Sequence, residues 1–412
     1  MNSILFEKNR NKILNQMKDN SIFIVFNRPK NGDIFKQEYN MNRNYFYITG
    51  LLEFENIVVL QKINGNESSV IFINPYDEYK AKWVGAPLSK EEVTNISGIK
   101  NVRYLDSFEA FIGQLLSIVN DVYLDFTPQD TVYLTDDQVF AKKLKDKYPY
   151  ANIINGRSLF TKARTVKEKE EIDEMKKAIS ITNEGLKSIL SNIKPGLYEY
   201  QLEAYFDQAI KYHGSTGYAF PTIAAGGKNA CCLHYQKNSD VLNDGELVLF
   251  DLGCSLNMYC SDISRTYPIN GKFTDRQKQL YNIVLNGQKL VFANAKPGVT
   301  TKELNQILRN YFKEELYKIG LIKAKTEEEV SKYYFHGVSH HIGLDCHDLC
   351  EYTALKPGSI ISNEPGLYIA EEGIGIRIED DVLITENGAE WLSPQIIKEV
   401  DDIEKFIKEN QK

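Results

Sequence analysis

Apolar, β-branched and aromatic residues recur in short runs near the start of the chain, after an amphipathic segment that predicts an opening helix. Each run has the length of a strand and ends at Asn, Gly or Pro, so we predict strands at residues 21–26, 44–50, 56–63 and 68–74. The spacing of apolar residues then changes to three and four, which predicts helices at 107–119 and 137–148 around a strand at 122–126. This alternation is typical of an α/β domain of about 150 residues.

The regular spacing of apolar residues becomes weaker near residues 151–158, where we place a domain boundary. We expect one domain at residues 1–157 and a second at 158–412. The second domain begins with a long charged helix from about Thr165, whose apolar residues fall on one face. Further helices are predicted at 199–212, 274–295 and 300–318.

Acidic residues interrupt apolar strands in the second domain. Asp251 lies within ELVLFDLGC, and its spacing from Asp262 suggests a hairpin that brings the two carboxylates together. In the later segment GIGIRIEDDVLIT, the alternation places Arg377 and Glu379 on one side of a strand. Glu364 also follows an apolar run. A carboxylate without a partner is costly in such surroundings, so these acids require a cation.

Composition and charge narrow the classes of function. Apolar residues make up 42% and charged residues 25% of 412 residues, which is typical of a globular protein of two or three domains. The net charge of -7 without a basic stripe argues against nucleic acid as a partner. The N-terminus lacks the pattern of a secretion signal, and no apolar run approaches the roughly 20 residues of a membrane helix. We therefore expect no membrane partner and a cytoplasmic location.

All six cysteines and all six histidines lie beyond residue 212. Because the chain shows no secretion signal, we expect the cysteines to be buried reduced thiols and not disulfides. The absence of a CxxC pair argues against a structural zinc site. Four histidines fall within His336 to Asp348, which reads HGVSHHIGLDCHD. A polar loop with satisfied histidines is one explanation, but so dense a cluster favours a metal or catalytic site.

Candidate ligands from distant segments complete this cluster, namely Asp251, Asp262, His340, Glu364 and Glu379. Hard oxygen donors with one nitrogen suit Mn²⁺, Co²⁺, Fe²⁺ or Zn²⁺. Four carboxylates balance two divalent ions, whereas one ion would leave buried negative charge uncompensated. The alternative is a set of independent salt bridges.

The motifs DLGCSLNMYCSD, HGVSHHIGLDCHD, NEPGLYI and GIRIEDD together resemble those of the pita-bread metallopeptidases. The best match is aminopeptidase P, with prolidase close behind. The resemblance implies an α/β (α+β) protein in which a creatinase-like N-terminal domain precedes a catalytic pita-bread domain. NYFYITGL and INPYDEYKAKW resemble the N-terminal domain of that family, which would shape the substrate pocket and support oligomerisation.

The resemblance also implies roles for individual residues. Asp251 would bind one ion, Asp262 and Glu379 would bridge both, and His340 with Glu364 would hold the second. Glu364 would also move the proton. The remaining roles implied are substrate contacts for His234 and His347, a pocket wall for His336, support of a ligand carboxylate for Arg377, and a supporting donor for Tyr368. We expect His341 and His213 to be structural, and Trp83 to be either a partly buried anchor or a residue that reaches a neighbouring subunit.

The function implied is a metal-dependent Xaa-Pro aminopeptidase that removes the first residue of peptides with proline in second position. The cofactor would be two divalent ions, with Mn²⁺ favoured, and the assembly a homodimer or a dimer of dimers. A prolidase acting on Xaa-Pro dipeptides is the alternative. A metal-free relative such as creatinase, or a non-catalytic peptide-binding relative, is disfavoured because all five ligand positions are present.

Overall fold

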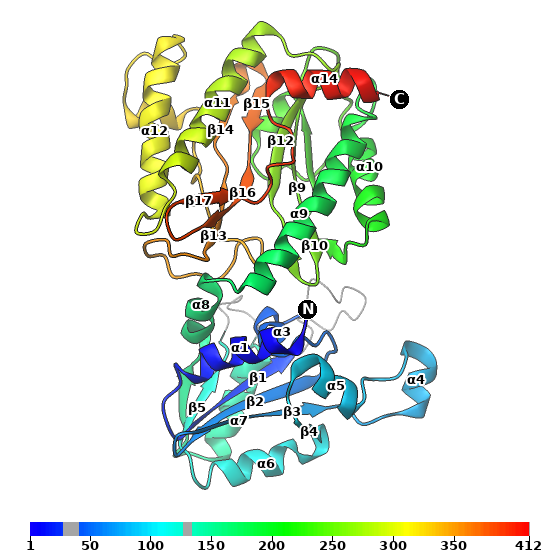
Figure 1. The fold of residues 1–412 in the computed structure, drawn as a ribbon, viewed down its shortest axis with the longest axis vertical. Helices are drawn as coiled ribbons and strands as arrows, with labels where there is room; N and C mark the ends of the chain where they lie inside the picture. The colour runs from blue at the N-terminus through cyan, green and yellow to red at the C-terminus, as the bar shows by residue number, and fades with distance from the viewer. Residues whose placement is uncertain (28–40, 127–133, 412) are drawn as a thin grey trace. The chain divides into compact units, whose positions relative to one another are not determined.

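The structure is a computed structural model that describes residues 1–27, 41–126 and 134–411 (Figure 1). The chain divides into two compact units, Met1–Arg164 and Thr165–Lys412. The division falls after Arg164, whereas the sequence placed it after residue 157.

The first unit is built on a six-stranded sheet with the strand order β4-β3-β2-β1-β5-β6. Strands β1, β2 and β3 pair antiparallel, and the outer pairs β3 with β4, β1 with β5 and β5 with β6 are parallel. The strands are β1 Ser21–Asn27, β2 Asn56–Ile63, β3 Asn66–Ile73, β4 Asn101–Tyr104, β5 Asp121–Leu124 and β6 Asn152–Asn155. The predicted strands near 21–26, 56–63, 68–74 and 122–126 are thus confirmed.

The helices of this unit include the predicted opening helix and both predicted amphipathic helices, the first of which is shorter than predicted. They are α1 Ser3–Leu14, α3 Arg43–Thr49, α4 Glu78–Val84, α5 Lys90–Ser97, α6 Phe108–Leu115, α7 Asp136–Lys147 and α8 Arg157–Thr165, which runs into the second unit. One face of the sheet packs against α6 and α7 in a core that includes Ile24, Phe72, Phe108 and Leu144.

The strand predicted at residues 44–50 is wrong, because this segment forms helix α3. The Asn42 side chain accepts hydrogen bonds from the backbone N–H groups of Asn44 and Tyr45 and caps the helix. Gly50 ends it with a φ of 71°, and a Cβ there would collide with the Phe6 ring. Almost every side chain of α3 is buried, so no polar face reveals the helical period.

Helix α4 carries two exposed aromatic residues, Tyr79 and Trp83, and Figure 1 shows it standing away from the sheet. Trp83 is 74% exposed and packs only obliquely on Tyr79, with ring centroids 6.2 Å apart. Trp83 is therefore not the partly buried anchor that was one of its two expected roles.

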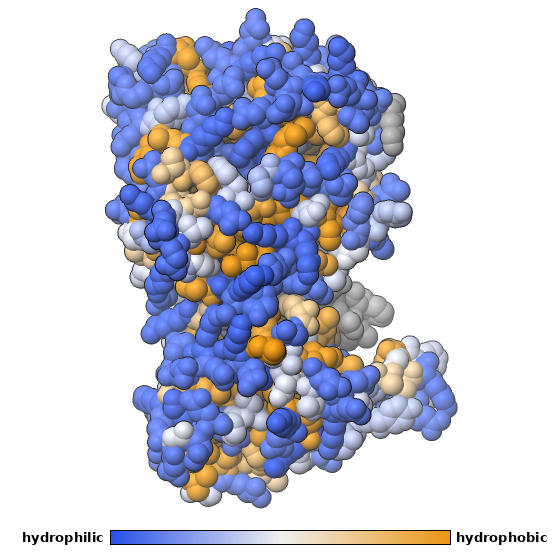
Figure 2. Space-filling model, in the orientation of Figure 1, coloured by the Kyte–Doolittle hydropathy of each residue, from blue (hydrophilic) through white to orange (hydrophobic). Residues whose placement is uncertain are grey.

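Hydrophilic residues cover most of the face shown in Figure 2, and no helix in the described residues is long and apolar enough to cross a membrane.

The second unit combines long helices with several small antiparallel sheets. The sheet orders are β12-β9-β8, β11-β10-β7, β13-β16-β17 and β14-β15. The strands are β7 Gly217–Tyr218, β8 Ile223–Gly226, β9 Leu247–Leu252, β10 Cys254–Leu256, β11 Tyr259–Cys260, β12 Ile263–Pro268, β13 Ile360–Asn363, β14 Gly366–Ile369, β15 Ile374–Arg377, β16 Asp380–Ile384 and β17 Ala389–Trp391. Figure 1 shows these strands lying between helices.

The predicted helices of this unit are confirmed. They are α9 Lys169–Leu190, α10 Glu199–Tyr212, α11 Asp275–Asn294 and α12 Thr301–Lys318, to which the structure adds α13 Glu327–Ser331 and α14 Val400–Asn410. Helix α9 packs on β10, α10 on β8, and α11 on β15, so helices support the strands that carry the candidate site.

The predicted hairpin is present, since β9 and β12 pair antiparallel with Asp251 opposite Ser264. The predicted strand over GIGIRIEDDVLIT, however, is broken into β15 and β16, which join different sheets. At the break, the Glu379 N–H donates to the Ser264 carbonyl at 3.0 Å, so the backbone turns toward β12 instead of extending β15. This turn directs the Glu379 side chain toward the two aspartates.

Candidate metal centre

A cavity of about 540 Å³ in the second unit collects the candidate metal ligands and most of the other candidate site residues. Its wall contains the candidate ligands Asp251, Asp262, His340, Glu364 and Glu379 together with His234, His336, His347 and Arg377. The two aspartates belong to the β9–β12 hairpin, Glu364 follows β13, and Arg377 and Glu379 lie at the end of β15. The four histidines come from loops. The structure thus brings together residues that are up to 145 positions apart, from His234 to Glu379.

The carboxylates and one imidazole converge on a common point. Ligand atoms of Asp262, His340 and Glu379 all lie within 4.8 Å of one another, a grouping that could hold a metal ion. The His340 Nε2 atom is 3.4 Å from Asp262 Oδ2 and 3.5 Å from Glu364 Oε1. Asp251 Oδ1 is buried and has no hydrogen-bond partner within the described residues. These open acceptor positions fit cations held between the side chains.

Two serines that sequence reasoning missed orient the acids. Ser264 Oγ donates to Glu379 Oε2 at 2.7 Å and accepts from Arg377 Nε at 2.8 Å. Ser362 Oγ donates to Glu364 Oε1 at 3.0 Å and accepts from the His340 N–H at 2.9 Å. Each serine stands two residues from a candidate ligand, Asp262 or Glu364, and this same-face spacing in an extended segment was the available signal.

Arg377 is a buried cation with three separate partners. Its Nη2 donates to Asp251 Oδ2 at 2.7 Å, its Nη1 to Tyr368 Oη at 3.0 Å and its Nε to Ser264 Oγ. The planar guanidinium therefore fixes the directions of one candidate ligand directly and of Glu379 through Ser264. Arg377 and Glu379 both face Ser264, as the predicted alternation required.

The acids are short of positive charge. Burial raises the pKa of Asp251 and of Glu379, and the neighbouring carboxylates raise it further. Burial likewise raises the pKa of Glu364 to about 7. Burial lowers the pKa of His340, but its hydrogen bond to Asp262 and the nearby Glu364 outweigh this effect and raise it to about 9. These raised pKa values mean that the buried acids and the His340 imidazole favour bound protons. Divalent cations could replace these protons and compensate the same negative charge.

His336 is held as a neutral imidazole by the protein itself. Its Nδ1 lies 2.7 Å from the Gly337 carbonyl, which can only accept, so Nδ1 carries the proton. Its Nε2 then accepts from the Tyr368 hydroxyl at 2.9 Å. Burial lowers the pKa of His336 to about 4, in agreement with a neutral ring. The Tyr368 hydroxyl in turn accepts a hydrogen bond from Arg377. Tyr368, which was predicted to be a supporting donor, therefore links His336 to Arg377.

The other histidines divide as follows. His347 stacks on His340 with ring centroids 4.0 Å apart, and His234 lies exposed in the cavity wall. His341 lies outside this wall, with a buried ring whose pKa burial lowers to about 4. His213 follows the last turn of α10, away from the cavity. The positions of His341 and His213 agree with the structural roles expected for them.

Cys346 also lines the cavity, which the expectation of buried structural thiols did not foresee. Its Sγ donates to Asp262 Oδ2 at 2.9 Å. Cys254, Cys260 and Cys350 are buried as expected, whereas Cys231 is half-buried and Cys232 is exposed, so the expectation of buried thiols is wrong for these two. Because Cys346 directly precedes His347, its position in the histidine segment was the one available signal.

Comparisons with known proteins identify the family. Residues 173–386 match the model of metallopeptidase family M24, and residues 6–123 match the model of the aminopeptidase P N-terminal domain. The Xaa-Pro aminopeptidase of Haemophilus influenzae is 30% identical over 98% of this chain and 96% of its own length. This chain belongs to the aminopeptidase P family. It is a metal-dependent hydrolase, as predicted.

Solved structures of aminopeptidase P proteins agree with this assignment over the whole chain. A Bacillus anthracis structure assigned to aminopeptidase P is 42% identical, with a TM-score of 0.96, and covers 100% of this chain and 99% of its own. Zinc-substituted Escherichia coli aminopeptidase P with product is 29% identical, with a TM-score of 0.92, and covers the same shares of the two chains. The predicted fold, an N-terminal α/β domain followed by a pita-bread domain, is confirmed. The comparisons favour the aminopeptidase over the prolidase alternative.

Proposed function

We propose that this protein releases the first residue from peptides that carry proline in second position, as an Xaa-Pro aminopeptidase. The observation that carries the proposal is the convergence of Asp251, Asp262, His340, Glu364 and Glu379 in one cavity of an M24 fold. Relatives of near-equal length that bear the name Xaa-Pro aminopeptidase support it.

The five candidate ligands would hold two divalent ions. Asp262 and Glu379 would be shared by both ions, whereas Asp251 on β9 would serve one ion and His340 with Glu364 the other. The short distances from His340 Nε2 to Asp262 Oδ2 and Glu364 Oε1, 3.4 and 3.5 Å, support this grouping. Hard oxygen donors favour Mn²⁺, although the zinc-substituted relative shows that other ions enter such a site. When bound, such ions supply Lewis acidity that activates water and stabilises negative charge on the substrate carbonyl oxygen.

The protein's own residues would position the substrate and move the proton. Glu364 is fixed by Ser362 through Oε1, which leaves Oε2 to receive a proton from water and pass it to the leaving nitrogen. His234 and His347 lie in the cavity wall, where their N–H groups can donate to the peptide carbonyl as charge develops. His336 has both ring nitrogens engaged and therefore shapes the wall.

The apolar part of the wall suits a proline ring. Phe220, Pro221, Ile223 and Leu233 line the same cavity as the acids. Proline fixes its backbone and lacks an N–H, so a site for it must read ring shape instead of a hydrogen bond. A compact apolar wall beside the ligands provides this kind of recognition.

Substrate length tests the function. We expect Mn²⁺-loaded protein to release the first residue of Xaa-Pro-Xaa tripeptides with a kcat/KM at least about tenfold above that for Xaa-Pro dipeptides, measured by liquid chromatography of the products. Xaa-Ala-Xaa tripeptides serve as the matched control and should react slowly. A preference for dipeptides would establish the prolidase, and release from neither would remove both functions.

The support given by Ser264 yields a second prediction. Ser264→Ala removes the hydroxyl between Arg377 and Glu379, and changes of this kind usually weaken metal binding by about 10- to 100-fold. Calorimetric titration of the metal-free protein with Mn²⁺ measures the change. Ser117→Ala, an exposed serine of the first unit, is the control and should bind Mn²⁺ like the unchanged protein. Equal affinities of the two variants would exclude the supporting role of Ser264.

Mn²⁺ as the native ion, a cytoplasmic location and a homodimer or dimer of dimers stay predictions. Exposed Tyr79 and Trp83 on α4 are the residues on which we would first test the assembly.

A further inference from the structure

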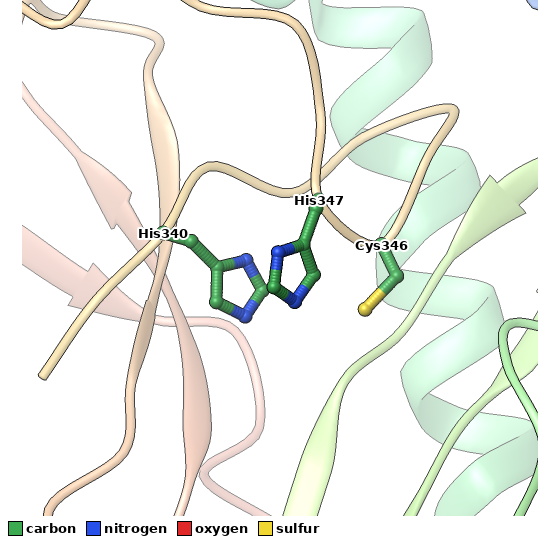
Figure 3. Close-up of side chains that lie close together, drawn as sticks. All are labelled: His340, Cys346 and His347. Carbon is green, nitrogen blue, oxygen red and sulfur yellow. The ribbon is translucent and has the colours of Figure 1, made fainter. Parts of the chain in front are cut away.

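The thiol of Cys346 lies inside the candidate metal centre. The segment after His340 turns back so that Cys346 and His347 approach the His340 ring, and Figure 3 shows the sulfur and both imidazoles directed into one space. Cys346 Sγ also lies 2.9 Å from Asp262 Oδ2. The thiol therefore touches a residue that we assign to the metal pair, on a side of the cavity where it meets two imidazoles.

His340, Cys346 and His347 offer a second set of metal donors. One ligand atom from each lies within 4.8 Å of the other two, and the two imidazoles stack with an interplanar angle of 18°. Two nitrogens and one sulfur form a softer set than the carboxylates do, and such sets select ions that bind thiolate. His347 is exposed, so its ring can rotate to bring the donors to the separation of about 3.5 Å expected around a tetrahedral ion.

We propose that His340, Cys346 and His347 form a sulfur and nitrogen site for a thiophilic divalent ion of the zinc and cadmium class. Binding would release the thiol proton to solvent and replace the hydrogen bond from Cys346 to Asp262 with a sulfur–metal bond. Asp262 Oδ2 or a water completes four ligands.

The site would make the enzyme sensitive to thiophilic ions. His340 belongs to both donor sets, and His347 faces the substrate space, so an ion held by Cys346 withdraws one proposed ligand and one proposed substrate contact together. This consequence rests on the proposed function, whereas the binding of the ion itself does not. We expect excess Zn²⁺ or Cd²⁺ to block the Mn²⁺-loaded enzyme.

Absorption spectroscopy tests the sulfur ligand. Protein loaded with Mn²⁺ is titrated with Cd²⁺, and the sulfur-to-cadmium charge-transfer absorption in the ultraviolet is followed. The unchanged protein should develop this absorption and saturate near one equivalent, and Cys346→Ser should lose most of it. Cys232→Ser, which removes an exposed cysteine outside the cavity wall, is the matched control and should behave like the unchanged protein. Full absorption in Cys346→Ser would overturn the proposal.

A second measurement needs no variant. X-ray absorption at the zinc edge of Mn²⁺-loaded protein with one added equivalent of Zn²⁺ should show a sulfur neighbour at about 2.3 Å. A zinc shell of nitrogen and oxygen alone would refute the site, even if Cys346→Ser failed to fold. Because neither readout depends on peptide cleavage, a negative result leaves the peptidase function standing, and loss of the peptidase function leaves this test valid.

Discussion

Asp262→Asn should lower the Mn²⁺-dependent kcat/KM by about a thousandfold or more, equivalent to about 4 kcal/mol of transition-state stabilisation. Asp262 contacts His340 and Cys346 through Oδ2 and is proposed to be shared by both ions, so one changed oxygen affects both. The amide keeps the shape of the side chain but removes its charge. Bound Mn²⁺ per chain, measured by atomic absorption, should fall together with activity.

Asp275→Asn is the matched control for this change. Asp275 is an exposed aspartate in the first turn of α11, and its variant should keep both Mn²⁺ and activity. An Asp262→Asn protein that retained full Mn²⁺ content and full activity would show that the ligand set is assigned wrongly. Loss of activity with retained Mn²⁺ would instead place Asp262 outside the ligands and in the proton path.

The candidate ligands could be found from the sequence because each acid interrupts an apolar segment. A carboxylate at such a position costs too much free energy unless a cation or hydrogen bonds compensate it, so Asp251 and Glu379 were conspicuous. The β9–β12 pairing that the spacing of Asp251 and Asp262 predicted brings these two aspartates together, and the contact of the Glu379 N–H with the Ser264 carbonyl brings Glu379 to them. The motifs then supplied the partners from distant loops, and the structure places all of them together.

Residues that only support the ligands were not visible in the same way. A serine in a strand, such as Ser264, is common and does not by itself indicate a site. Its supporting role depends on hydrogen bonds with Arg377 and Glu379, which belong to a distant segment of the chain. The break between β15 and β16 was missed for a related reason. Alternation continues through Glu379, and a contact with the distant Ser264 carbonyl decides where the strand ends.

Helix α3 shows the limit of periodicity itself. Its aromatic and β-branched residues favour a strand locally, and burial on nearly all sides removes the polar face that would indicate a helix. The caps at Asn42 and Gly50 were the informative residues. In a fully buried segment, the capping residues at its two ends therefore indicate a helix better than the composition of the segment does.

Arg377→Met should destabilise the metal-free protein by about 3–5 kcal/mol, because it leaves the buried Asp251 carboxylate without its cation. Urea unfolding of the metal-free protein measures this change. Arg377→Lys is the matched variant. It keeps the charge and should recover part of the stability, but a single ammonium cannot reach Asp251, Tyr368 and Ser264 together, so activity should stay low.

The pH dependence separates charge compensation from packing. Burial already raises the pKa of Asp251 in the folded protein, and loss of Arg377 raises it further. An acid with a raised folded pKa loses stability as the pH rises from its unfolded pKa, about 4, toward its folded pKa. The deficit of Arg377→Met should therefore be small near pH 4 and grow toward neutral pH. A deficit that is equal at both pH values would mean that Arg377 acts by packing and not by its charge.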